Sequence, residues 1–489
     1  MKKRIFAVLT GLCLAVAYTS ADELKVTVSA EAASTGYIGN GVEWDPYDEV
    51  ESWGATLSES DWQKLFERLD FMRPAYVRCM INSPYRYYDP ATGKYDKTRN
   101  IQSISRLLQY CTDRNITVVY GEYNPPTRSM KDSQEWVDMS VDYLNYLVNE
   151  LGFSCIRYFV IFNEPDGDWA STDGDYELWK SMLFRFHDKM SQYLGLKEKV
   201  QFAGPDVVME YKNSNSEFDA QGWLRQTAQD ADSLIGVYDI HAYPGQSEVR
   251  KGEIAEVLSR YRQAVPGNKK IILGEAGFKY WREADSLLMK EYNRRLEGHP
   301  FTKGSDANML VYDTFYGLDM ALLCIEVMNS GFSGAAAWML DDAMHSNGDS
   351  GKPEDIKLWG MWNILGEEVF HDATQEEVRP WYYAWSLLCR YFPAGSTILK
   401  TTFDRTQGVY IAVAEQEGQY AMAAVNIGNS DKQLSIEFPS DWGNVSLYVY
   451  NEEHPVPALS EITVKKTHRM TVPAQSFVLL TNRICGVFH

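Results

Sequence analysis

The stretch "YFVIFNEPDGDW", residues 158–169, runs through five mostly apolar residues into Asn163, Glu164 and Pro165. The apolar run predicts a buried strand, and Pro165 ends it because proline cannot donate to a strand ladder. A carboxylate at the mouth of a buried strand costs free energy unless it is paired or used. The stretch therefore predicts a strand whose C-terminal end carries a functional acid.

Similar apolar runs recur along the chain, and amphipathic segments with predicted N-caps at Ser60 and Ser133 lie between them. Strands that alternate with helices favour a parallel sheet. Eight such units predict an α/β fold, a closed (β/α)8 TIM barrel over residues 34–392, with its site at the C-terminal strand ends. The eight runs are residues 36–44, 75–81, 116–124, 156–165, 200–206, 236–244, 269–278 and 334–342.

The sequence pattern changes after residue 392, where short runs of alternating apolar and polar residues are separated by turn residues. This pattern predicts a C-terminal antiparallel β-sandwich over residues 393–489, which a strand from 22–33 is expected to join. Three long strand-to-helix loops are expected around the mouth of the barrel, where such loops shape access to the site. They are residues 166–176, 279–310 and 341–365.

The N-terminus combines Lys2, Lys3 and Arg4 with an apolar run and then small residues, which is the form of a signal peptide over residues 1–21. We expect an exported protein, periplasmic or extracellular, without membrane insertion because no later run reaches about 18 apolar residues. The formal net charge of −20 argues against nucleic acid as a partner. The oligomeric state is left open.

The cysteines are scattered, and six of the seven lie beyond the signal segment. Most lie in apolar runs, so we interpret them as small buried hydrophobic residues without a disulfide framework. The absence of CxxC and HExxH motifs argues against a structural zinc site, and we expect no metal and no cofactor.

Glu275 in "IILGEAGF", residues 271–278, is the best partner for Glu164. Carboxylates from the fourth and seventh strands can face each other across a barrel, and glycoside hydrolysis needs such a pair. One acid protonates the leaving oxygen while the other attacks the anomeric carbon or activates water. A separation of about 5–5.5 Å gives retention and about 6.5–9.5 Å gives inversion. The alternative for Glu275 is a strand-end salt bridge.

Other strand ends carry Arg78, His241, Tyr243 and Trp338. Arg78 can keep a neighbouring carboxylate ionised, and a tyrosine hydroxyl can hydrogen-bond the nucleophile. Trp338 offers a platform for a sugar ring. Each residue alone fits a barrel core equally well, but their occurrence at successive strand ends favours a site.

These motifs, "FNEP", "GEAGF", Arg78, "HAY" and Trp338, together resemble clan GH-A retaining glycoside hydrolases. The segments "AAWMLDD", "LWGMWNI" and "RPWYYAWSLL" are most similar to glycoside hydrolase family 39, with families 30 and 5 as close alternatives. The resemblance implies that Glu164 is the acid/base and Glu275 the nucleophile. It also implies that Asn163 holds the sugar 2-hydroxyl and that Arg78 and Tyr243 orient Glu275. The loop 341–360 is longer than in this family pattern, so the resemblance does not predict the substrate pocket.

The double-displacement cycle needs a protonated Glu164 at rest, and we expect the charge of Glu275 to raise the Glu164 pKa. Further strand-end residues are predicted to bind substrate, and Glu122 is the main rival for a catalytic role. The acidic residues of the 341–355 loop are interpreted as a solvated loop, with a calcium site as the alternative. The predicted substrate-binding residues are Glu43, Trp44, Asp45, Glu122, Tyr123 and Asn124, and the loop acids are Asp341, Asp342, Asp349, Glu354 and Asp355.

The sequence thus predicts an exported enzyme that cleaves β-type glycosidic bonds of an oligo- or polysaccharide with retention. A non-catalytic carbohydrate-binding barrel and a transglycosidase, in which a sugar replaces water as acceptor, are the alternatives. The sugar, its linkage and the choice between exo and endo action stay open.

Overall fold

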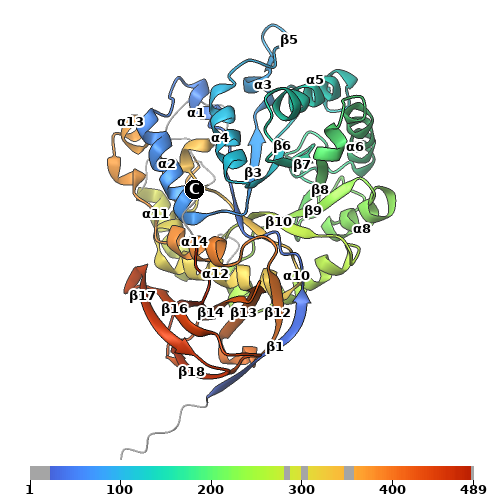
Figure 1. The fold of residues 1–489 in the computed structure, drawn as a ribbon. Helices are drawn as coiled ribbons and strands as arrows, with labels where there is room; N and C mark the ends of the chain where they lie inside the picture. Colours follow the sequence, from blue (N-terminus) through green and yellow to red (C-terminus); the bar gives the residue numbers. More distant parts are fainter. Residues whose placement is uncertain (1–22, 280–286, 299–306, 346–356, 486–489) are drawn as a thin grey trace, which may run out of the picture.

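The computed structural model describes residues 23–279, 287–298, 307–345 and 357–485. The predicted signal segment, residues 1–21, lies outside these ranges. Eight parallel strands close into a barrel in the order β10-β11-β2-β3-β6-β7-β8-β9 (Figure 1). All eight predicted strands are present, as β2 (Gly41–Glu43), β3 (Tyr76–Ile81), β6 (Thr117–Glu122), β7 (Ile156–Val160), β8 (Gln201–Val208), β9 (Ile235–Ala242), β10 (Ile271–Ala276) and β11 (Ala335–Ala337).

The barrel interior is a packed core. Alternate residues of each strand point inward, so one set of side chains fills the inside while the other set packs against the helices. The inner set combines apolar side chains with the polar groups of the site, such as Arg78 and Glu275. Its apolar members are Tyr76, Met80, Val119, Val160, Ala203, Val237, Ile272 and Ala336.

One long helix follows each barrel strand, and Figure 1 shows these helices around the barrel. Ser133 caps its helix as predicted, by accepting from the Trp136 backbone N–H. The prediction for Ser60 is wrong, because Ser58 and Asp61 form a reciprocal capping box two residues earlier. The helices are α2 (Glu59–Met72), α4 (Gln102–Asp113), α5 (Gln134–Asn145), α6 (Tyr176–Met190), α8 (Ala220–Asp230), α10 (Ile254–Gln263), α12 (Thr314–Asn329) and α14 (Trp381–Tyr391).

Shorter elements decorate the connections between strands and helices. Several of them lie in the strand-to-helix loops that surround the C-terminal end of the barrel, where the sequence places the site. They include α1 (Asp48–Ser52), α3 (Ser83–Arg86), α7 (Leu196–Lys199), α9 (Gln246–Arg250), α11 (Leu287–Gly298), α13 (Gly366–Phe370) and the hairpin β4 (Tyr88–Asp89) and β5 (Lys94–Tyr95).

The C-terminal part of the chain forms a second, mixed sheet in the order β17-β16-β19-β14-β13-β12-β1-β15-β18. The N-terminal strand β1 pairs antiparallel with β12 and parallel with β15, which is the one departure from a purely antiparallel sandwich. The strands are β1 (Leu24–Ser34), β12 (Thr397–Thr402), β13 (Val409–Gln416), β14 (Gln419–Asn426), β15 (Lys432–Glu437), β16 (Gly443–Asn451), β17 (His454–Val464), β18 (Thr467–Val472) and β19 (Ser476–Thr481).

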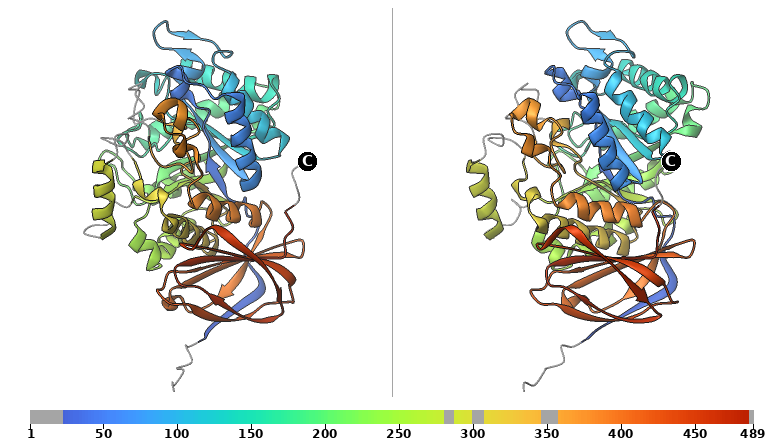
Figure 2. Two further views of the ribbon diagram at one scale, coloured as in Figure 1. Left: turned by 90° about the vertical axis from the view of Figure 1, so that its left-hand side faces the viewer. Right: turned by 60° about the vertical axis from the view of Figure 1, so that its left-hand side comes forward.

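This sheet folds over its own apolar core, and its edge strand β18 contacts β14 and β19. Its other face packs on α12 and α14 of the barrel, where the Tyr450 hydroxyl donates to the Thr314 carbonyl at 2.8 Å. Both views of Figure 2 show the sheet stacked against one side of the barrel.

Strand β10 contains a register shift between Leu273 and Glu275 relative to β9. A bulge of this kind turns two neighbouring residues toward the same side of a sheet. Here Gly274 and Glu275 both face the barrel interior, and a methyl group added at Gly274 would lie 2.2 Å from Asp239 Oδ1. The bulge therefore directs Glu275 inward and requires glycine before it.

The six cysteines of the described residues are free thiols, five of them buried, in agreement with the absence of a disulfide framework in the prediction. Within the described ranges, no helix combines the length and the apolar composition that crossing a bilayer requires.

Candidate active site

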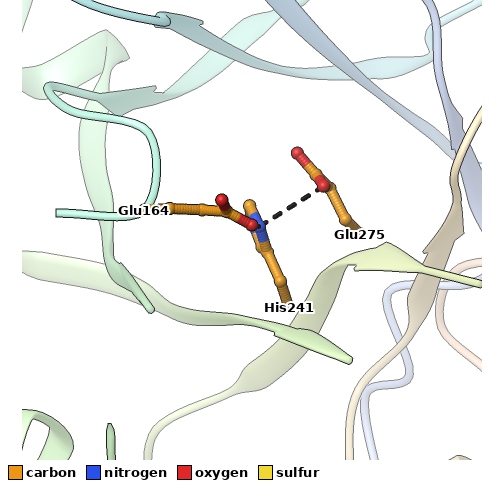
Figure 3. A group of neighbouring side chains, drawn as sticks. All are labelled: Glu164, His241 and Glu275. Atoms are coloured by element: carbon orange, nitrogen blue, oxygen red, sulfur yellow. Dashed lines mark hydrogen bonds and ion pairs between the residues drawn. The ribbon is translucent and has the colours of Figure 1, made fainter. Parts of the chain in front are cut away.

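Glu164 and Glu275 meet at the C-terminal end of the barrel. Glu164 lies just beyond β7 in the left-handed backbone region, with φ of 47°, and Glu275 lies in β10. One carboxylate oxygen of each, together with a ring nitrogen of His241, lies within 4.8 Å of the others. Figure 3 shows the three side chains pointing toward one another. This backbone conformation is uncommon for a residue other than glycine and costs about 1 kcal/mol. Such strained residues are often found at functional sites.

Arg78 joins the acids of this site from β3. Its Nη1 donates to Glu275 Oε1 at 2.7 Å and to Glu43 Oε1 at 2.9 Å. Its Nη2 donates to Asn163 Oδ1 at 2.7 Å and to Asp206 Oδ2 at 3.0 Å. Because the Asn163 oxygen is engaged by Arg78, the amide nitrogen of Asn163 is the group left to face a ligand.

His241 lies between the two catalytic candidates and a third carboxylate. Its Nδ1 is 2.8 Å from Glu164 Oε1 and 3.4 Å from Glu275 Oε2, while Nε2 is 3.1 Å from Asp206 Oδ1. Both ring nitrogens therefore have carboxylate partners. Burial disfavours the charged ring, but Glu275 and Asp206 outweigh it and raise the His241 pKa well above its ordinary value.

Glu275 has a second donor besides Arg78, because the Tyr243 hydroxyl donates to its Oε2. The side chain is only 5% exposed, so its two oxygens are surrounded by protein donors and the pocket. These donors hold the carboxylate in one orientation, as a nucleophile requires.

The protonation state predicted for Glu164 is contradicted by the structure. Burial alone would raise its pKa, but the hydrogen bond and charge of His241 and the charge of Lys279 outweigh it. The pKa of Glu164 is therefore lowered, and the proton of the Glu164–His241 pair lies on His241 at rest. The prediction of a raised Glu164 pKa took account of repulsion from Glu275 and not of the contact with His241, which lowers it.

A pocket of about 180 Å³ opens onto Glu164 and Glu275. The indole N–H of Trp169 donates to Glu164 Oε2 at 2.7 Å, and Lys279 Nζ lies 4.3 Å from the centre of the Tyr243 ring. Apolar faces with a few fixed polar groups are the usual lining of a small-ligand site. The other lining residues are Tyr123, Asn163, Trp338, Lys357 and Trp359.

Two predicted binding residues do not reach this pocket, and those predictions are wrong. Trp44 is fully buried outside the barrel wall and packs edge-on against Phe66 and Tyr110. Glu122 is also fully buried, and it accepts hydrogen bonds from Tyr87, Trp136 and Ser140. Both lie at positions that strand alternation turns toward the helices.

The remaining predicted residues line the site or support it. Glu43 is buried against Arg78, and Asp45 accepts from the Tyr123 hydroxyl at 2.6 Å. Asn124 lines a neighbouring cavity, and Trp338 stacks on His345 with ring centres 5.1 Å apart.

Sequence reasoning missed Asp206 and Lys279. Asp206 lies near the C-terminal end of the apolar strand β8 and, like Glu164, has a positive φ, of 65°. Arg78 and His241 together overcome the effect of burial and lower its pKa to about 2. A second inward aspartate, Asp239, has no hydrogen-bond partner for either side-chain oxygen among the described residues. Burial and the charge of Asp206 raise its pKa to about 8.

The loop acids Asp341 and Asp342 are neither solvated nor arranged for calcium. Asp341 is fully buried and accepts from the Tyr47 hydroxyl and the Trp362 indole, each at 3.0 Å. Asp342 accepts from Arg379 and from the Trp359 backbone N–H at 2.8 Å. The predictions of a solvated loop and of a calcium site are therefore wrong for these two residues, because their carboxylates stabilise the loop through internal hydrogen bonds. Asp349, Glu354 and Asp355 lie outside the described residues.

Two groups of acids around His241 have the proximity of metal ligands: Glu164 with Glu275, and Asp206 with Asp239. A metal in either group would need a ring nitrogen of His241 that already has a carboxylate partner, Glu164 at Nδ1 or Asp206 at Nε2. Both ring nitrogens of His241 are thus already engaged, although the carboxylate of Asp239 has no hydrogen-bond partner among the described residues.

No protein-family model and no curated protein matches the chain. Solved structures do match over almost the whole length. The catalytic domain of GH30 xylanase C from Talaromyces cellulolyticus aligns at 14% identity with a TM-score of 0.64, covering 94% of this chain and 99% of that one. A conserved exported protein from Bacteroides fragilis aligns at 13% identity with a TM-score of 0.63, covering 93% and 99%.

A GH39 β-xylosidase from Caulobacter crescentus aligns at 12% identity with a TM-score of 0.57, covering 94% of this chain and 99% of that one. At these identities the likeness shows a shared fold. The predicted (β/α)8 barrel with its C-terminal sheet is thus confirmed. Two of the three families that the motifs resemble are among the proteins that share it.

Proposed function

We propose that the chain is an exported retaining glycoside hydrolase that cleaves β-type glycosidic bonds. The observation that carries this proposal is the approach of Glu164 and Glu275 to within 4.8 Å between carboxylate oxygens. This bound on the nearest oxygens favours the retaining arrangement, with carboxyl groups about 5–5.5 Å apart, over the inverting one of about 6.5–9.5 Å. The shared fold with a xylanase and a xylosidase supports the same chemistry.

In the first step Glu275 attacks the anomeric carbon while the glycosidic bond breaks. Arg78 and Tyr243 donate to Glu275 and keep it oriented before the attack. The leaving oxygen takes a proton from Glu164, and Glu164 receives that proton from His241 across their 2.8 Å contact. The products of this step are a glycosyl ester on Glu275, a neutral imidazole and a released alcohol.

The second step reverses these roles. Esterified Glu275 carries no charge, so it no longer stabilises the imidazolium. The Glu164–His241 pair takes a proton from water as the water oxygen attacks the anomeric carbon. The bond from the sugar to Glu275 breaks, and the sugar leaves with its original anomeric configuration.

Aryl β-glycosides with leaving groups of different acidity test this assignment. Glu275→Ala is expected to abolish turnover of all of them. Glu164→Ala is expected to lose about 10²- to 10⁴-fold on poor leaving groups and little of the first step on good ones. Equal losses on all leaving groups would contradict the acid/base role of Glu164.

Labelling and product analysis separate the alternatives. A 2-fluoro glycoside inactivator should attach to Glu275, as shown by peptide mass spectrometry. A non-catalytic binding protein would show neither label nor turnover, whereas a transglycosidase would form longer saccharides in place of free sugar.

A further inference from the structure

A second cavity, of about 290 Å³, adjoins the catalytic pocket. It lies over the C-terminal ends of four consecutive barrel strands, β11, β2, β3 and β6. Tyr123 lines both spaces, and His345, which lines the second cavity, stacks on Trp338 in the first. The two spaces are therefore neighbouring parts of one mouth.

The lining of this second cavity mixes flat apolar groups with free amides. Two prolines and two methionines supply the apolar part. The side-chain amides of Asn82 and Asn124 have no hydrogen-bond partner within the described part of the chain, although the backbones of both residues are bonded. Each free amide offers two donors and an acceptor, which match the vicinal hydroxyls of a sugar ring.

The position of the cavity relative to the acids indicates which end of the substrate it receives. The leaving group departs past Glu164, where Trp169 is 47% exposed and packs on Tyr211. Neither Glu164 nor Trp169 lines the second cavity. It therefore lies on the opposite, glycone side of the scissile bond, an assignment that rests on the proposed function.

The charges around the cavity restrict the sugar. Asp45, Asp48 and Glu49 line it, and Asp48 is ion-paired with the buried Arg86. Among the described residues that line the cavity there is no lysine or arginine. An anionic sugar would meet three carboxylates, of which Asp48 is paired with Arg86 and Asp45 contacts His345 Nε2 at 2.6 Å. A uronic acid is therefore disfavoured and a neutral ring is accepted.

We propose that this cavity is a subsite for a second, uncharged sugar ring of the glycone. The enzyme then acts on chains with at least two sugars before the scissile bond, rather than trimming single terminal residues. Asn82 and Asn124 bind the hydroxyls of the second ring.

The test compares 4-nitrophenyl glycosides of one sugar with those of its disaccharide: xyloside with xylobioside and glucoside with cellobioside. We expect kcat/KM to be at least about tenfold higher for the disaccharide of the accepted sugar. In Asn82→Ala/Asn124→Ala this preference should fall about tenfold. The single substitution Asn124→Ala changes an exposed side chain and should lower the disaccharide preference by less than the double substitution does.

Asn268→Ala is the matched control, because Asn268 is exposed in the turn before β10, at the other end of the barrel. It should keep the full disaccharide preference. A disaccharide that ends in glucuronic acid should react more slowly than its neutral counterpart, and Glu49→Gln should narrow that difference.

Equal kcat/KM for mono- and disaccharide, or a preference that survives Asn82→Ala/Asn124→Ala, would overturn the subsite. A faster reaction of the glucuronic acid substrate would overturn its selection for neutral sugars. Failure of the proposed function looks different, since no aryl glycoside would then be turned over at all.

Discussion

Two buried aspartates of the barrel, Asp206 and Asp239, should respond oppositely to the same substitution by asparagine. Asp206 accepts hydrogen bonds from Arg78 and His241, and its pKa is lowered to about 2. Asp239 has no hydrogen-bond partner for its carboxylate oxygens among the described residues, and its pKa is raised to about 8. The charge of Asp206 thus stabilises the fold at neutral pH, whereas Asp239 must take up a proton in order to be buried.

The magnitudes follow from the distance of each pKa from its unfolded value near 3.8. For Asp206, Asp206→Asn should lower the free energy of unfolding by about 2 kcal/mol at pH 7. That contribution is present above pH 4 and is lost as the pH falls toward 2. For Asp239, the folded state binds a proton that the unfolded state has released, so Asp239→Asn should raise the free energy of unfolding by about 4 kcal/mol at pH 7.

The pH dependence separates this reasoning from a simple packing effect. The gain from Asp239→Asn should shrink to about 2 kcal/mol at pH 5, because less free energy is then needed to protonate the buried acid. The loss from Asp206→Asn should be the same at pH 5 and pH 7. Urea unfolding of both variants and the wild-type protein at the two pH values measures this. A destabilising Asp239→Asn, or a gain that does not change with pH, would refute the argument.

Three further outcomes are expected at the active site. His241→Gln should move the alkaline limb of the kcat/KM profile to lower pH. In the wild-type protein the Glu164–His241 pair keeps its proton up to the raised His241 pKa, while in the variant only the Glu164 carboxyl can hold it. Initial rates measured across pH test this. An alkaline limb that does not move would contradict a proton shared by Glu164 and His241. Tyr243→Phe removes a donor to Glu275 and should lower kcat about tenfold with KM little changed. Dialysis against EDTA should leave initial rates unchanged, because both ring nitrogens of His241 already have carboxylate partners. A loss of rate that a divalent cation restores would contradict this.

The fold was predictable because its signals are local and repeated. Each barrel strand is a short apolar run, and an amphipathic helix follows it. The alternating runs that predict the C-terminal sheet are residues 396–404, 408–416, 420–428, 432–439, 445–452 and 475–482. They omit β17 and β18, which are the two edges of the sheet. Strand β17 carries Pro455 and Pro457 near its start, and such residues are tolerated at an edge but argue against a strand in a sequence pattern.

The acids of the candidate site were predictable from the sequence. The directions of neighbouring side chains and the protonation of Glu164 were predicted less well. Alternation along β2 and β6 turns Glu43 and Tyr123 inward and Trp44 and Glu122 outward. That parity was available in the sequence and would have corrected both errors. The link between His241 and Glu164 was not available, because it depends on how strands distant in sequence approach each other.

The bulge in β10 makes the proposed chemistry sensitive to the length of the strand as well as to its composition. Deleting Gly274 would restore a regular two-residue repeat in which Glu275 still points inward, but one residue step, about 3.3 Å, nearer the N-terminal end of the strand. Relatives with this arrangement should therefore tolerate substitutions along β10 more readily than a one-residue deletion. A shortened strand would retain every chemical group of the site and still place the nucleophile too low in the barrel to keep its contacts with Arg78 and Tyr243.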